Sequence, residues 1–514
     1  MFSRSDGTKD DSRWALIATG FMAFIGVCLI FLFPGSPEQD VDYHFLMART
    51  AWVDHFYFVD VWGRPLFTTL FAPVAALGFI PARFLALAIS LGAAWQTYRL
   101  AWDLRMPRAW LVIPFLLGQP TFFELYSNLF TEPLFAFVLV IALRCHISGR
   151  IRLGMLVASL LPLARPEGVF VCLFWGFWVV ALPHLQRART SEKAVNQRER
   201  GGQMGRSGEV LGFYRQIINR VGSIVILASG VGIWWLAAWL LTGDPLFILH
   251  NWPVTWHTGV YGHGTFLSYA QRSQEFAGVI LIVPFIVGLV RGFRSRSWIL
   301  ITSVFLVLFL LHSTFVKYGL FGEAGFPRYL VSVAPAMALL TLEGWNTIFS
   351  VKMLHPFATA VGWVVLTFSI LQSVHYLDAM VWARDTVAID DLAKWLQRQD
   401  PSVSGLIWSN GRMCIDLNRN LKDSPPAEGR EKLLVRLEKA APKTIVFWDN
   451  EIGPNWFGVT AAEIEGRGYK LLSSRHYSLP ALIFCPGRFS GVPGASLFPA
   501  IPAREIELSL LEKE

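Results

Sequence analysis

The sequence is a series of long apolar runs separated by short basic segments, and this alternation restricts the fold more than any other feature. A helix needs about 20 residues to cross the hydrocarbon core of a bilayer. Because the runs approach that length, we expect an α-helical polytopic membrane protein with about eleven transmembrane helices. We place these helices at residues 14–33, 82–100, 109–123, 133–143, 153–164, 168–182, 224–241, 276–290, 298–315, 329–341 and 356–374.

The composition excludes several other classes of protein. Hydrophobic residues make up 54% of the chain and charged residues 16%, whereas soluble domains contain about 25% charged residues. Apolar residues are too abundant for a disordered or collagen-like chain, and 5 Cys are too few for a disulfide scaffold. The net charge of +8 comes from basic residues in the short segments between apolar runs, so we expect no nucleic-acid partner.

The basic residues also predict how the chain is oriented. Lys and Arg in the segments on the N-terminal side of the membrane outnumber those on the other side by about three to one. We therefore expect a bacterial inner-membrane protein with a cytoplasmic N-terminus, an uncleaved first span and a flexible cytoplasmic linker at residues 186–209. Residues 66–80 are apolar but contain Pro73, and we interpret them as a helix in the outer interface, because counting them as a span would place basic loops outside.

The character of the sequence changes after the last apolar run. We divide the chain into a transmembrane domain at residues 1–376 and a small outer α/β domain at residues 377–514. Helix-like segments at 390–399 and 430–441 alternate there with strand-like segments at 405–410, 444–449 and 481–485. Cys414 and Cys485 would both lie outside, where a disulfide is permitted, although two buried free thiols fit the sequence equally well.

Unusual polar residues gather in the outer segments of this topology. Ionisable side chains at the ends of spans are costly unless they are paired or face water, so we expect them to share one outer cavity. The candidates for catalysis or substrate binding are Asp40, Asp42, His44, Asp60, Arg64, Glu132, Arg165, Glu167, His257, Lys317, Arg328 and Tyr329.

Carboxylates and cations together suit a transferase that uses an activated lipid phosphate. A carboxylate takes the proton from an acceptor hydroxyl, and Arg or Lys holds the departing phosphate. Asp42 is our preferred base because a membrane boundary can raise its pKa, and Asp40 is a close competitor. Arg328, with Arg165 or Lys317, would hold the phosphate.

Structural roles compete with these assignments. Thr131 could cap a helix that begins with Glu132 and Pro133, where an acidic residue and a proline are both favoured. Arg165 and Glu167 flank Pro166 and could simply form an ion pair at a helix break.

The sequence predicts no certain cofactor. His250, His257 and His263 invite a divalent-metal hypothesis, but their spacings match no compact zinc signature. The chain also lacks the GxxxxGK[ST], GxSxG, HExxH and CxxC motifs, which argues against ATP-driven transport and zinc proteolysis.

Five motifs in order carry a resemblance to a known group of enzymes: VDYHF, FYFVDVWGRPLF, SNLFTEPLFAF, LPLARPEGVF and FPRYLVSVAPAMALL. With the order of spans over residues 14–376, they resemble the superfamily C glycosyltransferases (GT-C), including the protein O-mannosyltransferase and aminoarabinose transferase groups. The acidic base of this superfamily lies in the first outer loop, which corresponds to Asp42 or Asp40. Where the common form is Asp-Glu, this chain has Val41 after Asp40.

The resemblance implies an inverting glycosyltransferase that moves a sugar, mannose-like or another hexose or pentose, from a polyprenyl phosphate donor to an acceptor hydroxyl on the outer face. The acceptor would be a lipid, a glycan or a protein. Arg328 in the PRY motif resembles the donor-phosphate ligand, and the C-terminal domain resembles appendages that assist acceptor handling. The alternatives are a flippase or transporter of lipid-linked sugars, which needs a polar path through both leaflets, and a membrane anchor for a binding domain.

Overall fold

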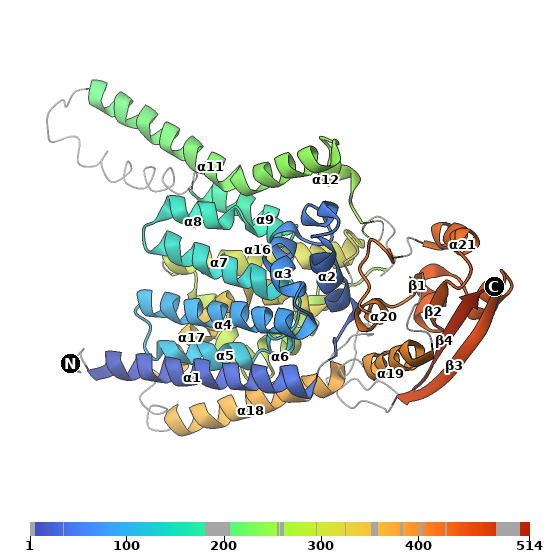
Figure 1. The fold of residues 1–514 in the computed structure, drawn as a ribbon. Coiled ribbons are helices and arrows are strands. Elements are labelled where there is room, and N and C mark those ends of the chain that lie inside the picture. Colours follow the sequence, from blue (N-terminus) through green and yellow to red (C-terminus); the bar gives the residue numbers. More distant parts are fainter. Residues whose placement is uncertain are drawn as a thin grey trace, which may run out of the picture.

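The structure of the protein is a computed structural model, which describes residues 6–33, 35–179, 206–253, 256, 262–294, 296–323, 325–350, 358–380, 384–399, 405–426, 429–479 and 504–514. A body of helices carries a four-stranded sheet at one end, and the N-terminus lies at the opposite end (Figure 1). We call the end of the helical body that faces residues 384–514 the capped end.

Four helices in the described part of the chain contain segments long and apolar enough to cross a membrane. They are α1 (Asp6–Leu32), α4 (Phe79–Asp103), α11 (Arg206–Thr242) and α16 (Arg296–Tyr318). At 1.5 Å per residue, the 27 residues of α1 extend about 40 Å, more than the hydrocarbon core requires. The protein is therefore an integral membrane protein.

The other helices complete the helical body. They are α2 (Gln39–Thr50), η1 (His55–Phe58), α3 (Pro65–Ala75), η2 (Ala109–Leu111), α5 (Val112–Leu117), α6 (Pro120–Leu125), α7 (Glu132–Ile147), α8 (Ile151–Ala158), α9 (Leu161–Ala164), Gly168–Val179, α12 (Phe247–His250), α13 (Ser268–Gln271), α14 (Ser273–Ala277), α15 (Ile282–Arg291), η4 (Pro327–Val333), α17 (Ala334–Ile348) and α18 (Ala358–Met380).

Helices occupy all eleven of the predicted spans where the structure describes them, but several spans are broken. Residues 109–123 divide into η2, α5 and the start of α6, with Pro120 beginning the last helix because proline lacks the amide donor that a helix interior needs. A total of about eleven crossing helices therefore stays a prediction. Helix α3 has 11 residues, about 16 Å, which is too short to cross a bilayer alone.

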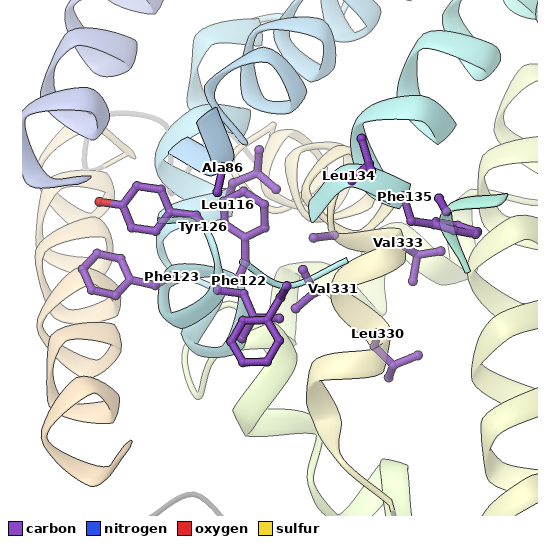
Figure 2. Close-up of a cluster of buried hydrophobic side chains, with 14 of the residues drawn as sticks. Ala86, Leu116, Phe122, Phe123, Tyr126, Leu134, Phe135, Leu330, Val331 and Val333 are labelled. Carbon is purple, nitrogen blue, oxygen red and sulfur yellow. The ribbon is translucent and has the colours of Figure 1, made fainter. Parts of the chain in front are cut away.

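The largest core cluster fills the helical body and extends into the region from residue 384 onward, where it includes Trp408 and Phe447. Phe122, Phe123 and Tyr126 from α6 and its end lie in the helical body, and Figure 2 shows them with Leu330 and Val331 from η4. Because these rings and aliphatic side chains are fully buried, they fix η4 against α6 and so determine where the PRY segment is held.

The region from residue 384 onward contains all four strands that the structure describes. Its helices are α19 (Arg384–Gln399), α20 (Gly411–Asp416), α21 (Gly429–Lys439), the π-helical turn η7 (Gly453–Phe457) and α22 (Ala461–Glu465), and its strands are β1 (Leu406–Trp408), β2 (Ile445–Asp449), β3 (Tyr469–Leu479) and β4 (Arg504–Lys513).

These strands form one sheet in the order β1-β2-β4-β3. Strands β1 and β2 are parallel with Leu406 opposite Ile445, while β4 runs antiparallel to both β2 and β3. Helices α19 and α21 and strands β1 and β2 coincide with the predicted segments, but the expected strand at 481–485 and Cys485 lie outside the described residues. The domain boundary at 376/377 and the pairing of Cys414 with Cys485 stay predictions.

Two glycines let α15 and α17 approach each other closely. A Cβ atom added at Gly288 would lie 1.8 Å from the carbonyl oxygen of Leu340, and one added at Gly344 would lie 1.7 Å from that of Pro284. Backbone approach of this kind requires residues without side chains, as in other membrane helix pairs. Neither position can accept a methyl group unless the two helices separate.

We predict that Gly288→Ala lowers the melting temperature of the purified protein in detergent, because overpacking costs about 1–3 kcal/mol. Gly232→Ala is the matched control, since Gly232 lies in α11 with no atom within 4 Å of an added Cβ. The melting temperatures are measured by tryptophan fluorescence during heating. Equal effects of the two substitutions would contradict this account of helix packing.

Candidate functional site

Several helix breaks place charged side chains together at the capped end. Glu132 is the first residue of α7, and η4 begins with Pro327, immediately before Arg328. Arg165 and Glu167 flank Pro166 in the turn after α9. Proline at or next to each break stops the regular helix from continuing, so these charged residues lie at helix ends.

Arg328 is paired with the segment that follows α1. Its guanidinium contacts the carboxylates of Glu38 and Asp40, at the start of α2, and its Nε lies 3.8 Å from Oε1 of Glu132. Arg328 is only 7% exposed, whereas the Asp40 side chain is 39% exposed. Asp40 is therefore the carboxylate in this group that a substrate can reach from solvent.

Glu132 is shared between two arginines. Its Oε1 lies 2.7 Å from Nη1 of Arg165, and the same nitrogen donates a hydrogen bond of 2.9 Å to the Thr131 hydroxyl. The Nε of Arg165 also pairs with Glu167. The predicted ion pair of Arg165 with Glu167 thus exists, but as part of a larger group. No hydrogen bond from the Thr131 side chain caps α7.

The chain of polar contacts continues inward from Glu167. His312 of α16 lies with Nε2 3.9 Å from Glu167 and Nδ1 2.9 Å from Glu323. The Tyr269 hydroxyl donates a hydrogen bond to the other oxygen of Glu323. Neither His312 nor Tyr269 was predicted from the sequence; the available signal was one histidine inside a long apolar run.

Aromatic rings cover both buried guanidiniums. The Arg328 guanidinium carbon lies 5.1 Å from the ring centre of Phe130 and 4.9 Å from that of Phe326. The Tyr329 ring lies 5.2 Å from the corresponding carbon of Arg165 and 5.6 Å from that of Arg328. Cation–π attraction of this kind adds to the ion pairs and holds the arginines in fixed orientations.

Arg64 lies close to this group without an ion pair to a described carboxylate. Its Nη1 donates to the Val61 carbonyl oxygen at 2.8 Å, while Nε is buried without a hydrogen-bond partner among the described residues. Burial lowers the pKa of Arg64 to about 10; the charge of Arg165 lowers it too, while Glu167 and Glu132 raise it. Arg64 therefore stays charged at neutral pH and lies close enough to Arg165, Glu167 and Glu132 to interact with their charges.

Asp42 lies on a different face of α2 from Asp40. Two residues along a helix correspond to a rotation of about 200°, so the two carboxylates point in nearly opposite directions. Asp42 is 2% exposed and faces Arg412 of α20 instead of Arg328. Burial raises its pKa to about 7, while Arg412 and a hydrogen bond with Ser36 act in the opposite direction.

Two other predicted residues near α2 make local structural contacts. The His44 ring stacks on Trp62 with 4.6 Å between ring centres, and burial lowers its pKa well below the usual value, so it is neutral. Asp60 accepts hydrogen bonds from the Gly63 amide at 2.6 Å and from the Asn251 side chain at 3.0 Å. Burial raises the pKa of Asp60.

The remaining predictions lie outside the cluster. Lys317 is exposed near the end of α16, with its amine 5.2 Å from the ring centre of Tyr318, and its role as a phosphate ligand stays a prediction. His257 lies outside the described residues, and His250 pairs with Asp244 at 2.7 Å. Across the described ranges, no three His, Cys, Asp or Glu side chains are grouped so that they could hold a metal ion.

Comparison with solved structures identifies the fold. The crystal structure of ArnT from Cupriavidus metallidurans bound to undecaprenyl phosphate matches with a TM-score of 0.56 over 92% of this chain and 97% of that chain, at 12% identity. The chain has the fold of ArnT. The resemblance to GT-C enzymes of the aminoarabinose transferase group is therefore confirmed for the fold.

Other comparisons add little to the likeness to ArnT. The apo structure of the same ArnT matches with a TM-score of 0.48, over 84% of this chain and 93% of that chain, at 13% identity. No family model and no curated protein matches the sequence.

The buried position of Asp42 predicts a measurable effect of pH on stability. A carboxylate whose pKa rises on folding stabilises the protein most when it is protonated. Its contribution to the free energy of unfolding is therefore lost as the pH rises from about 4 to about 7. We expect Asp42→Asn to reduce the loss of melting temperature that the wild type shows over this interval. Asp423→Asn is the control, because Asp423 is exposed. Identical pH profiles for wild type and Asp42→Asn would contradict the buried carboxylate.

Proposed function

We propose that the protein is a membrane glycosyltransferase that moves a sugar from a polyprenyl phosphate donor to an acceptor hydroxyl at the capped end. The observation that carries this proposal is the meeting of Asp40, Arg64, Arg165 and Arg328 at one end of the membrane helices. Such a site holds a carboxylate that can take a proton beside cations that can hold a phosphate. The undecaprenyl phosphate bound to ArnT supports this choice of donor.

In the proposed reaction, Asp40 is the base. Its carboxylate takes the proton of the acceptor hydroxyl, and the acceptor oxygen then attacks the anomeric carbon. The bond between that carbon and the phosphate oxygen breaks, and the electron pair leaves with the polyprenyl phosphate. Attack from the face opposite the leaving group inverts the configuration. Asp40 fits this role better than Asp42, because it is accessible and lies beside the other charged groups.

Arg64 is the cation that we propose as the main ligand of the donor phosphate. Arg165 and Arg328 each contact two or more carboxylates already. Arg64 can bind a phosphate oxygen without breaking an ion pair in the described part of the protein. Arg328 would then chiefly orient Asp40. It would also contact the phosphate on the side away from Arg64, in keeping with the role as phosphate ligand that the PRY resemblance implies.

The finer points of the proposal concern the orientation of the protein and the sugar that it transfers. The capped end faces the outside of a bacterial inner membrane, and the donor sugar is a hexose or pentose. A transporter would need polar groups through both leaflets. The described ion pairs of the helical body instead include a connected group at the capped end. Isolated pairs, such as Arg144–Asp103 and Arg291–Glu343, lie near the other end.

The test uses the purified protein in lipid nanodiscs with a panel of radiolabelled polyprenyl phosphate sugars, including mannose and aminoarabinose. The wild type should release or transfer the sugar of at least one donor. Asp40→Asn should lower the rate by about 10²–10⁴, the contribution of a general base. Asp42→Asn at equal expression gives the comparison. Full activity of Asp40→Asn would reject this base, and release of no sugar by the wild type would reject the function.

Replacement of Arg64 tests phosphate binding separately from chemistry. We expect Arg64→Gln to raise the KM for the donor at least ten-fold, because a charge-assisted contact with phosphate is lost. The control is Arg294→Gln, an exposed arginine at the opposite end of the helical body. Unchanged donor KM in Arg64→Gln would show that the phosphate is bound elsewhere.

A further inference from the structure

The C-terminal region covers one side of α2, the helix that begins with the site carboxylates. The Tyr43 and Trp408 rings lie 5.4 Å apart, and the Leu421 amide donates to the Thr50 hydroxyl at 2.9 Å. Arg49 donates to the Asn418 side chain at 3.1 Å. These contacts extend along α2, and Figure 1 shows α20 between the helical body and the sheet.

A buried group of charges lies in the middle of this contact. Arg412 of α20 pairs with Asp416 at 2.8 Å, and its guanidinium carbon lies 5.3 Å from the Phe79 ring centre. Asp42 faces the same arginine, and a Cβ added at Gly411 would lie 3.5 Å from the Cβ of Asp42. Oδ1 of Asp42 and Nη1 of Arg412 are both buried without a hydrogen-bond partner among the described residues.

Such a group is costly to disrupt. Removal of the Arg412 charge would leave Asp416 buried without its ion-pair partner and Asp42 without the cation that it faces, so the change is felt in the elements that carry these residues. Here those elements are α2 and α20. The contact lies on the face of α2 that carries Asp42, so it favours one rotation of α2 about its own axis.

The rotation of α2 matters because its other face carries Asp40, and Glu38 precedes it. Both carboxylates must meet Arg328, which is held by η4 and the aromatic rings around it. A helix moves largely as a rigid unit, so rotation that displaces Asp42 from Arg412 also displaces Asp40 from Arg328. A misplacement of about 1 Å can lower a reaction rate by about 10².

We propose that Arg412 is a positioning residue of the transferase: by docking against Asp42 it holds α2 in the orientation in which Asp40 meets Arg328. The inference rests on the proposed function, and it gives the C-terminal region a role in the chemistry, apart from any role in handling the acceptor. Arg412 acts through α2 and does not touch the reacting atoms.

The experiment compares Arg412→Gln, Arg412→Lys, Asp42→Asn and the double variant Asp42→Asn/Arg412→Gln in nanodiscs. We measure kcat and donor KM per folded molecule, and hydrogen–deuterium exchange of the α2 peptide. Arg475→Gln is the matched control, since Arg475 belongs to the same region but pairs with Asp391 at the surface.

We expect Arg412→Gln to lower kcat by about 10–100-fold with little change in donor KM, and to speed exchange in α2 but not in α4. Arg412→Lys should restore part of the rate. The double variant should lose no more than the worse single variant, because both changes break one contact. Arg475→Gln should leave the rate and the exchange unchanged.

Three results would overturn the inference. Unchanged kcat per folded molecule in Arg412→Gln would show that the residue only stabilises the fold. Unchanged exchange in α2 would show that Arg412 does not hold this helix. A much greater loss in Asp42→Asn than in Arg412→Gln, with additive losses in the double variant, would make Asp42 the base. Failure of the proposed function would look different from failure of this inference: the wild type would transfer no sugar, while Arg412→Gln would still speed hydrogen–deuterium exchange in α2.

Discussion

The arrangement of the capped end depends on Glu132, a buried carboxylate shared between Arg165 and Arg328. Its contact with Arg165 joins the start of α7 to the turn after α9, and its contact with Arg328 joins both to η4. Charges removed from water need partners, so these separate segments must stay together. The fold thereby holds a set of cations and carboxylates where a charged lipid head group and a polar acceptor could both be bound.

Helix α2 connects this group to the C-terminal region. One of its faces carries Asp40 toward Arg328, and the other carries Asp42 toward Arg412. The same short helix therefore contacts both the helical body and the sheet-bearing region. If Asp40 is the base, the orientation of the base depends on contacts made far along the chain, and the C-terminal region belongs to the catalytic unit.

The sequence predicted the parts of the fold that follow from local rules. Apolar length indicated the helices, and the predicted topology placed Glu132, Arg165 and Arg328 on one side of the membrane, where we expected them to share a cavity. It could not separate Asp40 from Asp42, because their directions depend on how α2 packs against α20. His312 was missed because it lies within an apolar run, and β4 was missed although Glu505, Glu507 and Ser509 alternate with apolar residues there.

The most direct test of the account is an electron cryo-microscopy structure of the protein in nanodiscs with undecaprenyl phosphate. The account predicts the phosphate at the capped end, with its oxygens about 3 Å from the Arg64 guanidinium and Asp40 open to the acceptor side. A phosphate bound near Arg144 or Arg291, at the opposite end of the helices, would contradict the central claim.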